Sequence, residues 1–120
     1  MFKVLIVDDT AIYRNLIHII LASLDVEIID ACDGKDAITK YDEYKPDLVF
    51  MDVMMPVMDG ITATSIITAN HADANIVMCS SENDESVINN AMASGAKDYI
   101  LKPISTDAIL NVVEKYMNKK

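Results

Sequence analysis

The sequence contains few of the residues that mark specialised protein classes. It has no tryptophan, only three glycines and three prolines, and two cysteines among its 120 residues. Cys32 and Cys79 stand far apart and outside any CxxC spacing, so neither a zinc site nor a disulfide scaffold is indicated. The apolar run that starts at Met1 stops at Asp8, too early for a signal peptide or a membrane span. These absences predict one ordinary globular domain over residues 1–120, soluble and cytoplasmic, with reduced thiols.

Basic residues are scarce as well. Ten lysines and arginines stand against nineteen aspartates and glutamates, which gives a formal net charge of −9 at pH 7. Nucleic acids and anionic membranes are bound mainly through lysine and arginine, and a surface with this charge repels both. We therefore expect neither nucleic acid nor membrane to be a partner.

Five short apolar runs are spaced along the chain. They occupy residues 4–7, 26–29, 48–51, 76–79 and 98–101. Three of the runs are apolar at every position, which is typical of strands that are covered on both faces. Segments with helical spacing separate the runs and follow the last one, so a strand and a helix alternate five times. A parallel α/β sheet with helices on both faces is the simplest architecture for this order.

The first and the last helical segments carry the clearest apolar stripes. The first is expected to begin after Thr10, and the last after Ser105 or Thr106, because these residue types cap helices. The residues expected to face the core are Ile12, Leu16, Ile19, Ile20 and Leu24 in the first helix, and Ile109, Val112, Val113 and Tyr116 in the last.

Polar side chains follow four of the five apolar runs. Asp8 and Asp9 follow the first, Asp52 the third, Ser80 the fourth and Lys102 the fifth. Ligands of parallel sheets bind at the carboxyl ends of the strands, so these side chains are expected to share one edge. Three carboxylates repel one another unless a cation lies among them, and Mg²⁺ prefers oxygen ligands. The pattern predicts a Mg²⁺ site beside a hydroxyl and an ammonium group that suit phosphoryl oxygens.

Asp52 is the carboxylate that we expect to accept a phosphoryl group, since aspartyl phosphate is a known covalent form. Each residue also has an ordinary interpretation when taken alone. An aspartate pair before a helix is usually a cap, Ser80 can begin a helix, and Lys102 can be a solvated lysine. The combination at one sheet edge favours phosphoryl transfer over these separate interpretations.

Several stretches of the chain resemble the receiver domain of two-component response regulators. They are residues 4–10 (VLIVDDT), residues 52–60 (DVMMPVMDG), Ser80, and residues 95–103 (GAKDYILKP). The stretches occur in the family's order and extend over the whole chain. The resemblance implies a flavodoxin-like (βα)5 three-layer sandwich with a five-stranded parallel sheet in the order 2-1-3-4-5.

The resemblance also implies roles for the acidic residues. By position, Asp52 is the phosphoacceptor, Asp9 a direct Mg²⁺ ligand and Asp8 an acid that holds the metal through water. Asp52 and the backbone carbonyl of Met54 complete the implied set of Mg²⁺ ligands. Mg²⁺ is the only cofactor that the resemblance implies.

Ser80, Lys102 and Tyr99 match the family's switch. Ser80 is expected to hydrogen-bond the phosphoryl group, and Lys102, held by a cis bond before Pro103, to pair with it. Once Ser80 moves toward the phosphoryl oxygens, Tyr99 can turn into the space that it leaves. This movement would reshape the face formed by the fourth helix, the fifth strand and the fifth helix.

Two further positions bear on the lifetime of the phosphorylated state. In the family, the residues two after the acceptor and two after the switch hydroxyl flank the route of the attacking water, and here they are Met54 and Glu82. Methionine cannot orient water through a strong hydrogen bond. We therefore expect a comparatively long-lived aspartyl phosphate.

The implied function is signalling and not classical enzyme catalysis. A histidine kinase would supply the phosphoryl group, and the chain would catalyse only its own phosphorylation and dephosphorylation. Because the chain ends a few residues after its last helix, we expect a stand-alone monomer, foremost a chemotaxis regulator that docks on a flagellar motor switch protein. The alternatives are a phosphorelay intermediate that serves a downstream phosphotransfer protein, and a fragment of a larger regulator.

Other classes of protein fit the residues less well. A Mg²⁺-dependent phosphatase of the haloacid dehalogenase type also forms an aspartyl phosphate, but Thr10 stands where its general acid belongs. A flavin-binding module of similar fold needs a loop rich in hydroxyls and glycine where Asp8 and Asp9 stand. A pseudo-receiver that serves only for protein contacts is disfavoured, because the chain has the expected residue at all five functional positions, namely Asp8, Asp9, Asp52, Ser80 and Lys102.

Overall fold

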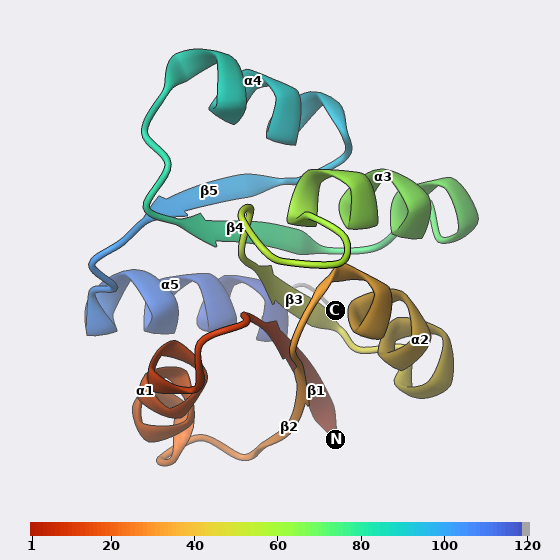
Figure 1. Cartoon of the computed structure of the whole chain (residues 1–120). Helices are drawn as coiled ribbons and strands as arrows, with labels where there is room; N and C mark the ends of the chain where they lie inside the picture. Colours follow the sequence, from red (N-terminus) through yellow and green to blue (C-terminus); the bar gives the residue numbers. More distant parts are fainter. Residues whose placement is uncertain (119–120) are drawn as a thin grey trace.

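Strands and helices alternate along the chain in the computed structural model, which describes residues 1–118 (Figure 1). The strands are β1 (Phe2–Val7), β2 (Val26–Ala31), β3 (Leu48–Met51), β4 (Ile76–Ser80) and β5 (Asp98–Leu101). The helices are α1 (Ala11–Leu21), α2 (Gly34–Tyr44), α3 (Gly60–Asn70), α4 (Glu85–Ala93) and α5 (Thr106–Met117). All five runs expected to be strands are strands. No helix within the described residues is long and apolar enough to cross a membrane.

The strands form one parallel sheet in the order β2-β1-β3-β4-β5, which confirms the expected topology. β1 lies between β2 and β3, with Val7 opposite both Ala31 and Met51. β4 lies between β3 and β5, with Met51 opposite Met78 and Ser80 opposite Leu101. The carboxyl ends of β1, β3, β4 and β5 are therefore side by side, and the residues that follow them meet at one edge.

Helices cover both faces of the sheet and make three layers (Figure 1). One face packs against α1 and α5 through a cluster that includes Ile17 and Val113. The other face packs against α2, α3 and α4 through a cluster that includes Tyr41 and Ile67. Every residue of β3 and β4 is buried, which explains why these two runs are apolar throughout.

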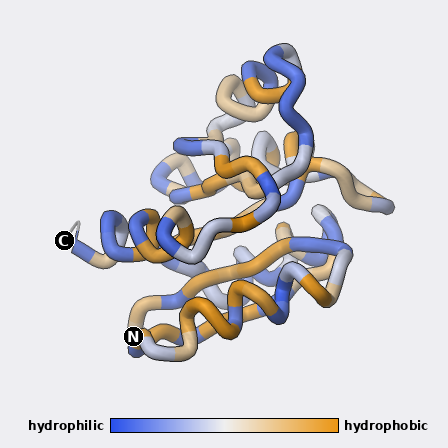
Figure 2. The backbone as a smooth tube through the Cα atoms, turned by 90° about the vertical axis from the view of Figure 1, so that its left-hand side faces the viewer, coloured by the Kyte–Doolittle hydropathy of each residue, from blue (hydrophilic) through white to orange (hydrophobic). Residues whose placement is uncertain are grey.

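α1 faces the core with only part of the predicted stripe, since Leu16, Ile20 and Leu24 pack against the core cluster but Ile12 and Ile19 do not. Its buried residues are Ile17, Ile20 and Leu21, whereas Ile12 and Ile19 are 74% and 71% exposed. The prediction for Ile20 is confirmed, but that for Ile12 and Ile19 is wrong. Much of the chain near the N-terminus is apolar (Figure 2), and the apolar residues of α1 span a wide arc of the helix, so its periodicity does not settle which part of the arc faces the sheet. Packing against α5 selects the orientation that leaves two large isoleucines on the surface.

The two predicted helix caps differ in outcome. Ser105 is the N-cap of α5, and its Oγ accepts the N–H of Ala108 at 3.3 Å. Thr10 is the N-cap of α1, but its side chain makes no capping hydrogen bond. Its backbone N–H instead donates to Asp8 Oδ1 at 2.9 Å, so the start of α1 is tied to the acidic edge of the sheet. The expected core residues of α5, namely Ile109, Val112, Val113 and Tyr116, are all buried.

Candidate functional site

Three aspartates meet where β1 and β3 end. One carboxylate oxygen from each of Asp8, Asp9 and Asp52 lies within 4.8 Å of the other two. Asp8 and Asp52 are buried, with 4% and 7% of their surface exposed, while Asp9 is open to solvent. The Asp52 N–H donates to the carbonyl of Val7 at 2.9 Å, so the pairing of the two strands continues into the site and fixes the acids side by side.

Lys102 joins two of these carboxylates from the end of β5. Its Nζ lies 2.8 Å from Asp8 Oδ2 and 3.5 Å from Asp52 Oδ2. The backbone N–H of Lys102 donates to the carbonyl of Ser80 at 2.9 Å, and the peptide bond between Lys102 and Pro103 is cis, as expected. Among residues 1–118 no other cation pairs with the three acids, so one ammonium pairs with two of the carboxylates and Asp9 has no cation partner.

Burial shapes the protonation of the site. Desolvation raises the pKa of Asp52, and the charges of Asp8 and Asp9 raise it further; Lys102 and the N–H of Val53, 2.8 Å from Oδ1, act in the opposite direction. Desolvation by itself lowers the pKa of Lys102, but the hydrogen bond to Asp8 and the charge of Asp52 outweigh it and raise that pKa overall. A hard divalent cation fits this donor set, because all three carboxylates can then stay ionised.

Ser80 and Tyr99 are linked through Glu82. Ser80 is almost fully buried, with 1% of its surface exposed, and its Oγ accepts the N–H of Glu82 at 3.2 Å. Tyr99 is half-buried, and its hydroxyl donates to the carbonyl of Glu82 at 2.7 Å. Burial raises the pKa of this hydroxyl, so it keeps its proton and remains a donor. The backbone of Glu82, two residues after Ser80, therefore holds both side chains, the Ser80 hydroxyl through its N–H and the Tyr99 hydroxyl through its carbonyl.

Met54 lies in the loop between β3 and α3, with 62% of its surface exposed. The loop returns to the sheet at Gly60, whose N–H donates to the carbonyl of Val53 at 2.8 Å. A Cβ at Gly60 would stand 1.8 Å from the carbonyl oxygen of Asp52, so only glycine fits. This contact with the backbone of Asp52 depends on the path of the loop, so the sequence pattern does not predict it.

Two residues of α1 belong to the site and were also missed. The ring of Tyr13 lies under the Lys102 ammonium, with 3.8 Å between Nζ and the ring centroid, which is a cation–π contact. Arg14 donates from its guanidinium to the backbone carbonyl of Asp8. Their position in the first turn after Asp9 is the one signal in the sequence that points to them, since that turn must start at the acidic edge.

Comparison with known proteins agrees with this geometry. The family of the response regulator receiver domain matches residues 4–114, and the chain belongs to this family. Receiver domains are signalling modules and not classical enzymes, and they bind Mg²⁺ at an acidic pocket.

Similar proteins include several chemotaxis regulators. The chemotaxis protein CheY of Bacillus subtilis is 44% identical over 117 residues, which are 97% of this chain and 98% of that protein. CheY of Listeria monocytogenes is 41% identical over 96% of this chain and 98% of its own. Among solved structures, the complex of CheX, CheY, BeF3 and Mg²⁺ from Borrelia burgdorferi has a TM-score of 0.90 at 36% identity, covering 98% of this chain and 90% of that one.

Proposed function

We propose that the chain, over residues 1–120, is a phosphorylatable response regulator that accepts a phosphoryl group on Asp52 with the help of Mg²⁺. The observation that carries the proposal is the meeting of three carboxylates within 4.8 Å, two of which share the ammonium of Lys102. Membership of the receiver family supports the same conclusion. The chain is thus a signalling protein whose only chemistry is the gain and loss of its own phosphoryl group.

The acids would hold the metal at the open side of the site. Asp9 and Asp52 are the proposed direct ligands together with the backbone carbonyl of Met54, and Asp8 acts through water. When bound, Mg²⁺ supplies the positive charge that neutralises both the carboxylates and the phosphoryl oxygens. The exposure of Asp9 fits an ion that keeps several of its waters.

Phosphorylation forms one bond and breaks one. A carboxylate oxygen of Asp52 attacks phosphorus, the bond from phosphorus to the donor atom breaks, and the electron pair of that bond leaves with the donor. Lys102 lies 3.5 Å from Asp52 Oδ2, so its ammonium can follow the charge onto the new phosphoryl oxygens. Ser80 supplies a hydroxyl from the neighbouring strand end. Hydrolysis by water reverses the modification and releases phosphate.

The switch would start at Ser80 and end at Tyr99. A hydroxyl that turns toward the phosphoryl group gives up its contact with the N–H of Glu82. The carbonyl of the same residue holds the Tyr99 hydroxyl at 2.7 Å, so both bonds to Glu82 change when the serine moves and the ring turns inward. The surface of α4, β5 and α5 then differs between the two states, and a target reads that difference.

The side chains of Met54 and Glu82 are proposed to set how long the phosphoryl group stays. Met54 is largely exposed and offers water no strong hydrogen bond. Water near the aspartyl phosphate is therefore poorly oriented on this side, which favours a long-lived phosphorylated state.

A histidine kinase is the proposed phosphodonor, and the exposed isoleucines of α1 favour docking beside the site. Ile12 and Ile19 are both more than two-thirds exposed on the helix that starts at the acidic edge. Exposed apolar side chains that lie together mark protein contacts. The relatives named CheY favour chemotaxis over a phosphorelay, so we propose a cytoplasmic monomer that, once phosphorylated, binds a protein target such as a flagellar motor switch protein.

Incubation with acetyl phosphate and Mg²⁺, followed by intact mass measurement, tests the proposal. We expect a mass increase of one phosphoryl group in the wild-type chain, none without Mg²⁺, and none in Asp52→Asn. Asp107→Asn, which removes an exposed acid at the start of α5, is the control and should be labelled like the wild type. A Mg²⁺-dependent adduct that survives in Asp52→Asn would refute Asp52 as the acceptor.

A further inference from the structure

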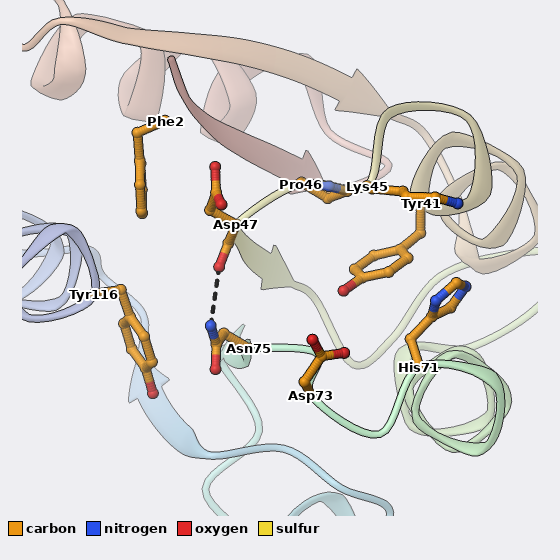
Figure 3. A pocket seen from close by; sticks show the side chains of 9 residues that line it. All are labelled: Phe2, Tyr41, Lys45, Pro46, Asp47, His71, Asp73, Asn75 and Tyr116. Carbon is orange, nitrogen blue, oxygen red and sulfur yellow. Dashed lines mark hydrogen bonds between the residues drawn. The ribbon is translucent and has the colours of Figure 1, made fainter. Parts of the chain in front are cut away.

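A cavity of about 520 Å³ lies at the amino ends of the strands, the edge of the sheet opposite the acidic site (Figure 3). Phe2 at the start of β1 and Tyr116 near the end of α5 form one side of it, and Tyr41 of α2 the other. All three rings are more than nine-tenths buried. A cavity of this volume with aromatic walls is typical of sites for small organic molecules.

Two carboxylates line the cavity without a cation partner. Asp47 and Asp73 come from the loops before β3 and β4, and within residues 1–118 neither of them forms an ion pair. One oxygen of Asp47 accepts the N–H of Lys3 at 2.8 Å, which fixes the carboxylate and leaves the other oxygen available. Asp73 is exposed at the mouth of the cavity. The cavity therefore places two carboxylates beside three aromatic rings.

The positive and neutral polar groups around the cavity are already engaged elsewhere. The ammonium of Lys45 lies 3.5 Å from the carbonyl of Asp42, the outer limit of a hydrogen bond, and the imidazole of His71 pairs with the Asp42 carboxylate at 2.9 Å. The amide of Asn75 donates to the Asp47 carbonyl at 3.1 Å and accepts from Lys97 at 2.6 Å. These bonds hold the walls in place and leave the two carboxylates to face the cavity.

The hydroxyl of Tyr41 is a separate sign of a ligand. Tyr41 is 6% exposed, its ring packs against the imidazole of His71 with 4.8 Å between centroids, and its hydroxyl points into the cavity (Figure 3). No hydrogen bond joins this hydroxyl to another residue within 1–118, and its oxygen is reached by solvent through the cavity. Burial raises its pKa, and the charges of Asp73 and Asp47 raise it further, so both carboxylates lie close enough to act on it.

From this arrangement we propose that the cavity binds a small organic cation, in which an ammonium or amidinium group is attached to an apolar body. The cationic group would lie between Asp47, Asp73 and the oxygen of Tyr41, and the body would pack on Phe2 and Tyr116. Aromatic rings favour cations over their faces, and the carboxylates exclude anions of the same shape. The site is independent of the phosphoryl acceptor, because it lies at the other edge of the sheet.

Benzamidinium is a suitable probe because two matched compounds test each part of the recognition. Benzamide has the same shape without the charge, and benzoate has the opposite charge. Each compound is titrated into the isotope-labelled protein at physiological salt with excess Mg²⁺, so that the acidic cluster is occupied, and the backbone amide signals are followed by NMR. We expect saturable shifts at Lys3 and Asp47 with benzamidinium, and none of that size with benzamide or benzoate.

Two variants test the contacts while keeping the fold. Asp73→Asn should weaken benzamidinium binding by roughly fivefold or more, since one partly solvated charge pair is lost. Tyr41→Phe keeps the ring against His71 and should weaken binding by roughly fivefold, the effect of one hydrogen bond. Asp107→Asn makes the same change in net charge at the other end of α5 and should bind like the wild type. Thermal unfolding checks that each variant is folded.

Three outcomes would overturn the proposal. The first is equal binding of benzamide and benzamidinium, which would make the carboxylates irrelevant. The second is unchanged affinity in folded Asp73→Asn and Tyr41→Phe. The third is a set of shifts confined to amides near Val53, which would show that the probe is drawn to the acidic cluster. Failure of acetyl phosphate labelling would leave these results untouched, so the proposal stands or falls separately from phosphorylation.

Discussion

Replacing Asp52 with asparagine is expected to stabilise the protein in the absence of Mg²⁺. Asparagine has almost the same shape, and its side-chain oxygen can still accept the N–H of Val53, which lies 2.8 Å from Asp52 Oδ1. The substitution removes one of three carboxylates that crowd within 4.8 Å. The change in stability therefore measures what the site costs the fold while no cation is bound.

The magnitude follows from opposing contributions. Loss of the charge relieves repulsion from Asp8 and Asp9, about 3 kcal/mol each for charges within 4.8 Å at an effective dielectric constant of about 20. It also forfeits the attraction of Lys102 at 3.5 Å, about 5 kcal/mol on the same scale. Because Asp9 is exposed and its share is screened, these contributions nearly cancel, and the desolvation of a buried ion decides the sign. We expect the free energy of unfolding to rise by about 1 to 3 kcal/mol at pH 7.

The gain is expected to depend on pH. Burial raises the pKa of Asp52 in the folded state above its ordinary value of 3.8, so between the two values the folded protein binds more protons than the unfolded one. The stability of the wild type therefore falls as the pH rises through that window. The asparagine variant lacks the group and does not share the fall, so its advantage is largest above the raised pKa and small below the ordinary one.

Urea unfolding followed by circular dichroism measures the difference. It is recorded at neutral and acidic pH, without Mg²⁺ and with about 10 mM Mg²⁺, which should stabilise the wild type more than the variant because it binds the intact site. Asp107→Asn controls for the loss of one surface charge and should change stability little. A variant that is less stable than the wild type at pH 7 without Mg²⁺, or a gain that does not shrink on acidification, would refute the reasoning.

Three further outcomes are expected. Met54→Asn should shorten the life of the phosphoprotein by roughly fivefold, since one hydrogen bond of about 1 kcal/mol can then orient water; unchanged or slower decay contradicts this. Gly60→Ala should lower the free energy of unfolding by about 2 to 4 kcal/mol in urea, because its Cβ would meet the Asp52 carbonyl at 1.8 Å; a loss below about 1 kcal/mol would show that the loop yields. Ile12→Ser with Ile19→Ser should slow labelling by the kinase and leave acetyl phosphate labelling unchanged, whereas Leu101→Ser, at 48% exposure, should leave both as they are.

The sequence predicts the sheet and the polar edge well for a simple physical reason. In a parallel sheet every strand points the same way, so the residue after each buried run must lie at one edge. Asp8, Asp52, Ser80 and Lys102 could therefore be placed together before their contacts were known. The uninterrupted apolar sequence of the runs also predicts their burial, as in β3 and β4.

Features that depend on how helices and loops pack in three dimensions could not be predicted from the sequence. The apolar residues of α1 span a wide arc, so its sequence does not say whether Ile12 or Ile17 faces the core. The bond between Tyr99 and the Glu82 carbonyl depends on where the loop after β4 runs. The cavity around Tyr41 is built from four separate segments of the chain, none of which has a distinctive pattern.

The hydrogen bond from Tyr99 to the carbonyl of Glu82 also bears on background signalling. An intact bond of about 1 kcal/mol favours the half-buried position of the ring roughly fivefold before any phosphoryl group arrives. Its loss in Tyr99→Phe would therefore change the share of unphosphorylated molecules in which the ring has this position. The strength of a single hydrogen bond to a backbone oxygen thus affects the level of signalling by unphosphorylated molecules. A stimulus must raise signalling above this level to be detected.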